Sequence, residues 1–248
     1  MTWLEAAAVF AAGTAAGTIN AVVGAGTLIS FPTLLALGYS PVLANVSNTV
    51  GLTPGSVSAA VGYRRELAGQ RSRLVRLGAA SAAGGVSGGV LLLRLPSAAF
   101  DAIVPVLIAV GCLLVLAQPY ITRWLGSHPV KPHGSTLVWV LVFAAGVYGG
   151  YFGAAQGVLL IAILGIGLQE TMQRANAAKN VLGAIVNGVA ATLFVLVAHV
   201  AWAVAGLIAL GSVLGGQLGA KVGRLLPDPL LRIVVVTVGA TAILTLRT

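Results

Sequence analysis

An apolar run from residue 136 to residue 168 is interrupted by the stretch Gly149-Gly150-Tyr151-Phe152-Gly153-Ala154-Ala155-Gln156-Gly157. A second run, from 4 to 37, is interrupted in the same way by Gly24-Ala25-Gly26-Thr27. At a rise of 1.5 Å per residue, an unbroken helix over 4–37 would be about 50 Å long, far more than the ~30 Å hydrocarbon core of a bilayer. We therefore expect both runs to be helices that are broken at the glycines.

Six further apolar runs each have about the 20 residues that one membrane crossing requires. They cover residues 41–62, 74–93 and 98–118, and then 173–198, 201–220 and 229–246. The chain thus divides into residues 1–118 and 136–248, joined by a polar connecting loop over 119–135. The predicted fold is all-α, a polytopic membrane helix bundle of about eight apolar segments in two internal repeats.

The composition supports a protein embedded in a lipid bilayer. Hydrophobic residues make up 58% of the chain and charged residues only 8%, against roughly a quarter charged in soluble domains. The net charge of +9 would suggest nucleic acid in a soluble protein, but here the arginines gather in short loops between apolar runs. We therefore expect no nucleic-acid partner and a multi-pass protein of the inner (plasma) membrane.

One constant shift in residue number relates the two halves of the chain. It places Gly26 on Gly157, Asn45 on Asn176 and Pro96 on Pro227. Basic residues crowd one loop of the first half, at Arg64, Arg65, Arg71, Arg73 and Arg76, and a different loop of the second, at Lys221, Arg224 and Arg232. If positive loops face the cytoplasm, the repeats are inverted rather than parallel.

The broken segments are the strongest indication of function. Unwound backbone at membrane depth leaves polar groups unpaired and occurs only where it is buried or lines a cavity. Transporters bind substrate at such breaks, where half-helix N-termini and the main-chain amides of Gly24, Gly26 and Gly157 would face an anion. The other interpretation is that the glycines serve only close helix packing.

An amide-rich helix start follows each break. The first contains Asn45, Asn48 and Thr49, and the second contains Asn176, Lys179 and Asn180, which share one helix face. Such a face can hold an oxyanion, with Lys179 supplying the charge. Interhelical hydrogen bonds and a lysine that extends to the membrane interface are the alternative.

Further polar side chains are expected at membrane depth, at Asn20, Ser30 and Gln156, whereas a single Asn187 is equally well explained by helix packing.

All five acidic residues fall near helix ends or in loops, so an anion or neutral solute is favoured over a cation. The candidate substrate-binding residues are Asn20, Gly24, Gly26, Asn45, Asn48, Thr49, Gln156, Gly157, Asn176, Lys179 and Asn180.

Enzymatic and metal-dependent functions have little support in the sequence. His128 and His133 share a loop, but no Cys, Asp or Glu accompanies them to complete a metal site. No serine has a histidine and an acid in its own half at a matching membrane depth. We expect no enzyme activity, no metal and no cofactor.

Two motifs carry a resemblance to the sulfite exporter TauE/SafE family. The first is Gly17-Thr-Ile-Asn20-Ala-Val-Val-Gly24-Ala-Gly26-Thr-Leu-Ile-Ser-Phe-Pro32, followed by Ala44-Asn45-Val46-Ser47-Asn48-Thr49. The second is Gly149-Gly-Tyr-Phe-Gly153-Ala-Ala-Gln156-Gly157, followed by Arg174-Ala-Asn176-Ala-Ala-Lys179-Asn180. The resemblance implies a membrane permease linked to sulfite or organosulfur anions. Ala25, Thr27 and Ala155 depart from the glycines often found in the family.

The expected function is therefore transport of a small anionic solute, such as sulfite, an organosulfonate or a carboxylate. The alternative is a membrane scaffold or accessory subunit that transports nothing, in which the glycines serve packing alone. A homo-oligomer is compatible with either function.

Overall fold

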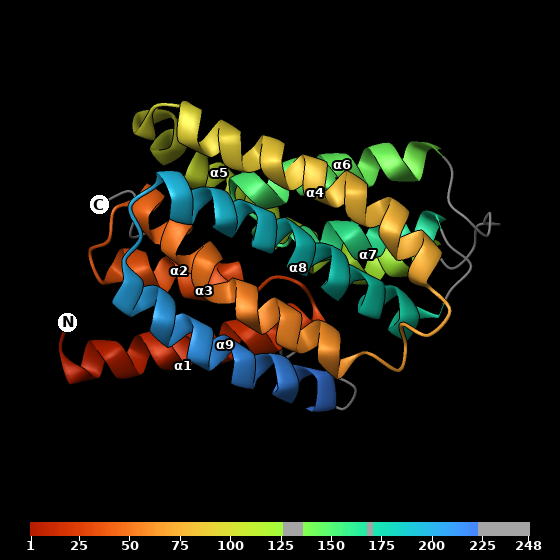
Figure 1. Cartoon of the computed structure of the whole chain (residues 1–248), viewed down its shortest axis with the longest axis horizontal. Helices are drawn as coiled ribbons and strands as arrows, with labels where there is room; N and C mark the ends of the chain where they lie inside the picture. The colour runs from red at the N-terminus through yellow and green to blue at the C-terminus, as the bar shows by residue number, and fades with distance from the viewer. Residues whose placement is uncertain (126–135, 168–170, 223–248) are drawn as a thin grey trace.

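The computed structural model describes residues 1–125, 136–167 and 171–222, and these residues form nine α-helices. The helices are α1 (Trp3–Val22), α2 (Thr27–Ala36), α3 (Pro41–Gly62), α4 (Arg71–Arg94), α5 (Ser97–Leu125), α6 (Thr136–Tyr151), α7 (Gln156–Gly167), α8 (Met172–Val197) and α9 (Trp202–Val222). They lie side by side along one long axis (Figure 1). The described part of the chain is an all-helical bundle, as predicted.

Both predicted breaks are present. The chain leaves the first helix of each half through a glycine of positive φ, which is +83° at Gly24 and +78° at Gly153. Each of these glycines donates its N–H to a carbonyl five residues earlier, at Ile19 (3.0 Å) and Tyr148 (3.1 Å). This is a common helix ending, and glycine suits it because an L side chain is strained at such φ values.

The helix ends at the two breaks do not follow the constant shift that relates the halves. α3 and α8 begin in register with that shift, at Pro41 and Met172. The shift assigns Ala155 to Gly24, but the glycine that ends the helix of the second half is Gly153. The pairing of Gly26 with Gly157 was therefore wrong by two residues.

The backbone differs between the breaks as well. When the two helix ends are superimposed, Gly26 corresponds to Ala155, which has a positive φ of +58°, whereas Gly26 has a helical φ of −59°. Each glycine-rich break contains several small residues, and the residue types alone do not reveal which residue adopts a positive φ.

Other glycines allow close packing between helices. A Cβ atom on Gly17 of α1 would overlap the backbone of Ser212 in α9, and one on Gly88 of α4 would overlap the carbonyl of Val147 in α6. Membrane helices approach closely through small residues of this kind. The packing interpretation thus holds for the α1–α9 and α4–α6 interfaces, whereas Gly24 and Gly153 also adopt a positive φ that close packing does not require.

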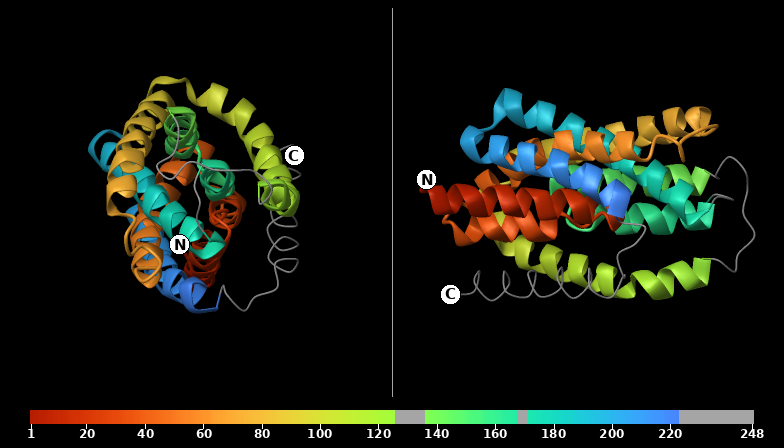
Figure 2. Two further views of the ribbon diagram at one scale, coloured as in Figure 1. Left: turned by 90° about the vertical axis from the view of Figure 1, so that its right-hand side faces the viewer. Right: turned by 90° about the horizontal axis from the view of Figure 1, so that it is seen from below.

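The helix directions differ between the halves. In Figure 1, α1 and α3 run away from the end that carries the N-terminus, whereas α6 and α8 run toward it. α1 packs on α9 and α4 packs on α6, so each broken helix contacts a helix of the other half, and α3 packs on α8 between them. Figure 2 shows α5 to one side of this group.

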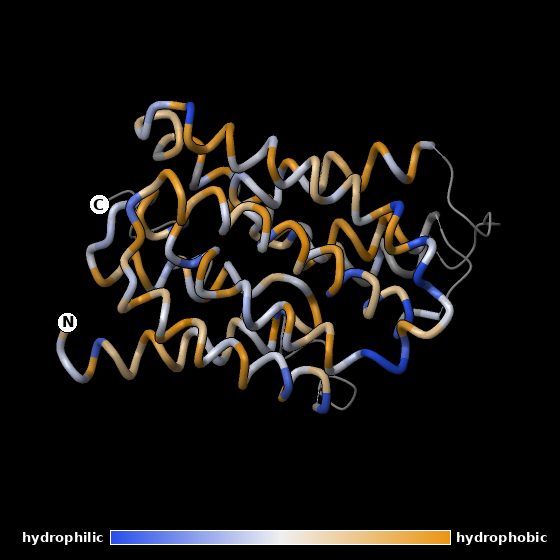
Figure 3. Tube along the Cα trace, viewed as in Figure 1, coloured by the Kyte–Doolittle hydropathy of each residue, from blue (hydrophilic) through white to orange (hydrophobic). Residues whose placement is uncertain are grey.

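The hydrophilic segments concentrate at one end of the bundle. Figure 3 shows them where α3 connects to α4, at the end where α8 begins and α9 finishes. The described residues there include the arginines between 64 and 76, together with Lys221 in the last turn of α9. Arg224 and Arg232 lie outside the described residues.

The outer surface is apolar. Large hydrophobic side chains are exposed along the outer helices, among them Val106, Leu113, Leu137, Leu196, Leu210 and Leu214. Within the described residues, three helices are long and apolar enough to cross a membrane, over Arg71–Arg94, Gln173–Val197 and Trp202–Lys221. These features are those of a membrane helical protein.

The end of the first half differs from the prediction. α5 continues to Leu125, past the expected end at 118, because apolar residues follow Pro119 and proline is tolerated in membrane helix bundles. The loop expected over 119–135 therefore begins later. The segment 229–246, Pro227, and the loop histidines His128 and His133 lie outside the described residues.

Candidate functional site

The two breaks meet each other near the centre of the bundle. The N–H of Gly157, at the start of α7, donates to the carbonyl of Gly24 at 3.0 Å. A Cβ atom on either glycine would overlap the Cα atom of the other. The contact is thus one of backbone on backbone, and it joins the two halves where both first helices are interrupted.

Some of the main-chain amides at the breaks are paired. Besides Gly24, Gly153 and Gly157, the N–H groups of Phe152 and Gln156 donate to nearby carbonyls, those of Tyr148 and Gly153. Of the three glycine amides expected to face an anion, those of Gly24 and Gly157 are used by a helix ending and by the contact between the breaks, whereas the N–H of Gly26 has no described acceptor. The N–H of Thr27, at the start of α2, and the N–H groups of Ala154 and Ala155 also have no described acceptor, and the buried Gln156 side chain adds a further unpaired donor.

The predicted polar face of α8 is confirmed, and it points at the end of α1. Asn176, Lys179 and Asn180 all donate to the carbonyl of Ala21, at 3.2, 3.2 and 3.1 Å. The Lys179 Nζ atom also donates to the carbonyl of Asn20 at 2.9 Å. These carbonyls lie in the last turn of α1, where intrahelical partners run out and the helix dipole is negative.

Lys179 is buried, with 2% of its surface exposed, so it does not extend to a membrane interface. It forms no ion pair with any described carboxylate, and its partners are the two carbonyls of α1. Carbonyl dipoles stabilise an ammonium group only in part, and a charge within a membrane protein is costly unless paired. The position of Lys179 therefore suits a ligand that carries negative charge.

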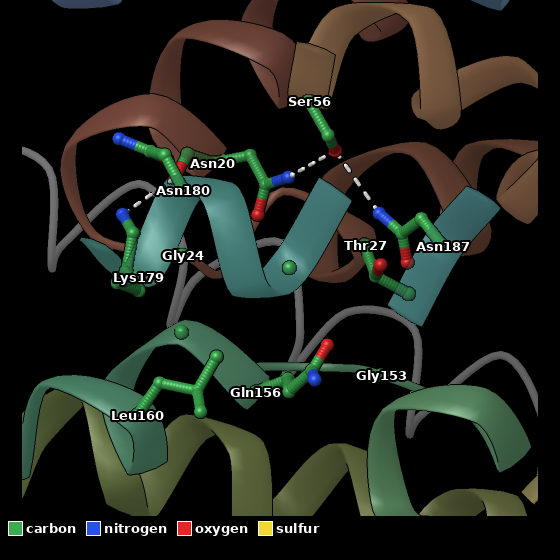
Figure 4. Close-up of a pocket in the computed structure, with 12 residues that line it drawn as sticks. Asn20, Gly24, Thr27, Ser56, Gly153, Gln156, Leu160, Lys179, Asn180 and Asn187 are labelled. Carbon is green, nitrogen blue, oxygen red and sulfur yellow. Dashed lines mark hydrogen bonds between the residues drawn. The ribbon is translucent and has the colours of Figure 1, made fainter. Parts of the chain in front are cut away.

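A small polar cavity of about 20 Å³ lies beside Lys179 (Figure 4). It is lined by the described residues Asn20, Gly24, Thr27, Ser56, Gly153, Gln156, Gly157, Leu160, Lys179, Asn180, Gly183 and Asn187. None of these is acidic. Both α2 and α7 begin at this cavity, with Thr27 and Gln156 as their first residues, so two helix N-termini add partial positive charge.

Two polar groups of the cavity differ in how they are paired. The side-chain Nε2 atom of Gln156 is buried and has no hydrogen-bond partner. Ser56 accepts hydrogen bonds from the side-chain amides of Asn187, at 3.0 Å, and Asn20, at 3.4 Å, and donates to the carbonyl of Leu52. Figure 4 shows the Ser56–Asn187 pair and the Lys179 ammonium on opposite sides of Asn20.

The 20 Å³ is the volume that the centre of a water molecule can occupy. Roughly 10–15 Å³ of such volume is needed for one water molecule, so the cavity has room for about one. A sulfur oxyanion has at least four heavy atoms and does not fit. In this conformation the cavity is therefore too small to hold such an anion.

Six of the eleven predicted site residues line the cavity: Asn20, Gly24, Gln156, Gly157, Lys179 and Asn180. Asn176 lies next to them on α8 and shares the Ala21 carbonyl. Gly26 does not line the cavity, and a Cβ atom there would overlap the carbonyl of Ala16.

Asn45, in the amide-rich part of α3, contacts the other broken helix instead. Asn45 donates its side-chain N–H to the carbonyl of Tyr151 at the end of α6 (3.0 Å), and Thr49 donates to the carbonyl of Asn45 (2.9 Å). The Oδ1 atom of Asn48 is buried without a partner. None of these three residues lines the cavity beside Lys179.

Ser56 is the main residue that the sequence reasoning missed. Its signal was available, because the constant shift between the halves, which holds for α3 and α8, places Ser56 on Asn187, and the two side chains are hydrogen-bonded. Asn187 itself was noted only as a residue equally well explained by helix packing. Thr27, Gly153, Leu160 and Gly183 complete the lining and have no polar pattern that would single them out.

Comparison with known proteins gives one family and several relatives. A family model described as "Sulfite exporter TauE/SafE" matches residues 9–246. The "Probable membrane transporter protein YfcA" of Escherichia coli (strain K12) is 26% identical over 233 residues, which cover 91% of this chain and 83% of that protein.

Two further relatives carry similar names. A "Probable membrane transporter protein" of Haemophilus influenzae is 29% identical over 221 residues, covering 87% of this chain and 84% of the relative. The "Probable membrane transporter protein ORF9" of a Sinorhizobium species is 29% identical over 216 residues, covering 86% and 80%. No solved structure matches the chain significantly.

Proposed function

We propose, from the premise that the chain belongs to the sulfite exporter TauE/SafE family of membrane transporters, that it carries a small anion through the cavity beside Lys179. The substrate class is sulfite, an organosulfonate or a related sulfur-containing or carboxylate anion. The observation that carries the proposal is a buried ammonium group without a described counter-ion, in a cavity that also holds an unpaired amide donor.

The hydrogen bonds around Ala21 favour release of a donor to an incoming anion. Its carbonyl oxygen has two lone pairs, yet three side chains of α8 donate to it. One of the three bonds is therefore weaker than a normal hydrogen bond and is lost at little cost. An anion next to Lys179 would gain that donor together with the Nε2 atom of Gln156.

The helix directions support two inverted repeats, with the halves at 1–118 and 136–248. α6 runs opposite to α1, and the two broken helices end in the same way. In this proposal the basic end of the bundle faces the cytoplasm, the protein crosses the inner membrane several times, and the cavity opens alternately to each side.

Flux measurements on Lys179 variants test the proposal. In proteoliposomes, we expect Lys179→Gln to reduce flux of sulfite or of a sulfonate to background. Lys221→Gln, which removes the same charge from the end of α9, serves as the matched control and should retain flux.

Asn180→Ala separates the charge of Lys179 from its structural contact. Both Lys179→Gln and Asn180→Ala remove a donor to Ala21, but only the former removes the ammonium group. We expect Asn180→Ala to lower the flux less than Lys179→Gln does, because the ammonium group remains in place. Full flux in a correctly inserted Lys179→Gln variant would remove Lys179 from the site.

A scaffold that transports nothing is the second candidate, and the glycine contacts between α1 and α9 favour it in part. Close packing does not, however, require a buried ammonium beside a polar cavity. A thermal-shift screen of the purified protein against sulfite, thiosulfate, sulfonates and carboxylates distinguishes the two candidates. A scaffold would show no stabilisation by any of these anions.

A further inference from the structure

A second hollow lies away from the polar cavity, on the outer surface at the basic end of the bundle. It has two branches of about 390 and 450 Å³, the first between α3 and α8 and the second between α4 and α8. The branches share Leu67, Val181 and Ile185, so they form one forked surface, called here the forked groove. Figure 1 shows α8 between α3 and α4 along this face.

The walls of the forked groove are apolar. Val57 and Val61 of α3 are each 50% exposed in the first branch, and Val75 of α4 is 67% exposed in the second. The small residues Ala60 and Ala184 leave room for an occupant in the first branch. On a surface that faces lipid, an apolar hollow of this kind suits a hydrocarbon chain better than water.

Each branch has an arginine at its border. Arg64 lines the first branch and Arg71 the second, and both are exposed. Arg71 has no hydrogen bond or ion pair with a described residue, and Arg64 donates only to the carbonyl of Val61, at 3.4 Å. No described residue that lines either branch is acidic. Two guanidinium groups without a counter-ion among the described residues suit a phosphate group.

We propose that the forked groove binds one anionic phospholipid from the membrane leaflet at the basic end. One acyl chain lies in each branch, and the phosphate lies between Arg64 and Arg71. The two branches match the two chains of a phospholipid, and the arginines match its headgroup charge. This site is separate from the cavity beside Lys179 and does not depend on which solute is transported.

The test uses the full chain in nanodiscs of phosphatidylcholine with a minor share of phosphatidylglycerol. Native mass spectrometry then counts the phosphatidylglycerol that stays bound when the nanodisc lipids are removed. We expect the double variant R64Q/R71Q to lower phosphatidylglycerol retention about tenfold, since each basic side chain near a membrane surface adds appreciably to the binding of anionic lipid.

The matched control is R65Q/R76Q, which removes the same charge from the same end at two exposed arginines outside the groove. It should retain phosphatidylglycerol as the unaltered chain does. Equal losses in both double variants would show only a general attraction to the basic surface and would overturn the proposal.

A third pair of variants tests the apolar part of the site. Ala184→Phe fills the branch beside α3 and leaves every arginine in place, while Ala79→Phe adds the same ring at an exposed position of α4 outside the groove. Only the former should lose phosphatidylglycerol. Undiminished retention in Ala184→Phe, or a dimer that covers the groove and excludes lipid, would overturn the proposal.

Discussion

Asn45 and Asn176 each hold the end of the broken helix in the opposite half of the chain. The side-chain amide of Asn45, on α3, donates to the carbonyl of Tyr151 at the end of α6 (3.0 Å). The side-chain amide of Asn176, on α8, donates to the carbonyl of Ala21 near the end of α1 (3.2 Å). Each break is therefore stabilised in part by a side-chain amide from the other half.

We predict that Asn45→Ala destabilises the protein more than Asn176→Ala. The carbonyl of Tyr151 loses the one side-chain donor described for it, whereas the carbonyl of Ala21 keeps Lys179 and Asn180. A buried polar group left unpaired costs about 1–3 kcal/mol, so the free energy of unfolding should fall by that amount for Asn45→Ala.

Equilibrium unfolding in detergent measures both asparagine variants. Thr192→Ala, at an exposed threonine that bonds only within its own helix, is the control and should change stability by less than about 0.5 kcal/mol. Equal losses in the free energy of unfolding for Asn45→Ala and Asn176→Ala would contradict the idea that the Ala21 carbonyl has more donors than it needs.

We predict that Gln156→Glu abolishes anion binding without harming the fold. A carboxylate in the same cavity as Lys179 supplies the missing negative charge and repels an incoming anion. The variant should melt at a higher temperature than the unaltered chain in the absence of ligand. Its affinity for sulfite should fall by at least about tenfold, which corresponds to about 1.4 kcal/mol.

Thermal unfolding with and without sulfite measures this effect. Gln156→Met is the matched variant, since it removes the unpaired Nε2 donor and adds no charge. It should bind sulfite more weakly than the unaltered chain but should not gain stability. A Gln156→Glu variant that sulfite still stabilises fully would place the anion elsewhere.

We predict that Gly24→Ala and Gly157→Ala both damage the contact between the breaks. A Cβ atom on either residue overlaps the backbone of the other, and at Gly24 the positive φ adds strain. We expect losses of at least about 2 kcal/mol in the free energy of unfolding, from overpacking and the left-handed backbone. The loss should be larger for Gly24→Ala.

Gly206→Ala, in α9, provides the control for the glycine variants. No atom lies within 4 Å of a Cβ atom built there, so the substitution should be neutral or should stabilise the helix by up to about 1 kcal/mol. If Gly206→Ala lowered the free energy of unfolding as much as Gly24→Ala and Gly157→Ala do, the contact between the breaks would have no specific role.

The sequence by itself determined the helical bundle, the two breaks and the polar face of α8. The apolar runs left little choice of fold, because a chain with 8% charged residues cannot cover a soluble surface. The runs over 4–37 and 136–168 were too long for one crossing, and Asn176, Lys179 and Asn180 share a face because of the helical period alone.

Only the tertiary structure decided which groups meet. It brought Gly24 against Gly157, directed Lys179 to the carbonyls of α1, and placed Ser56 in the cavity while Asn45 went to the other broken helix. It also paired the main-chain amides of Gly24 and Gly157, which the sequence suggested were free. Periodicity fixes which side of a helix a residue occupies, but the partner on that side depends on how helices from the two halves pack, and this is not encoded in local spacing.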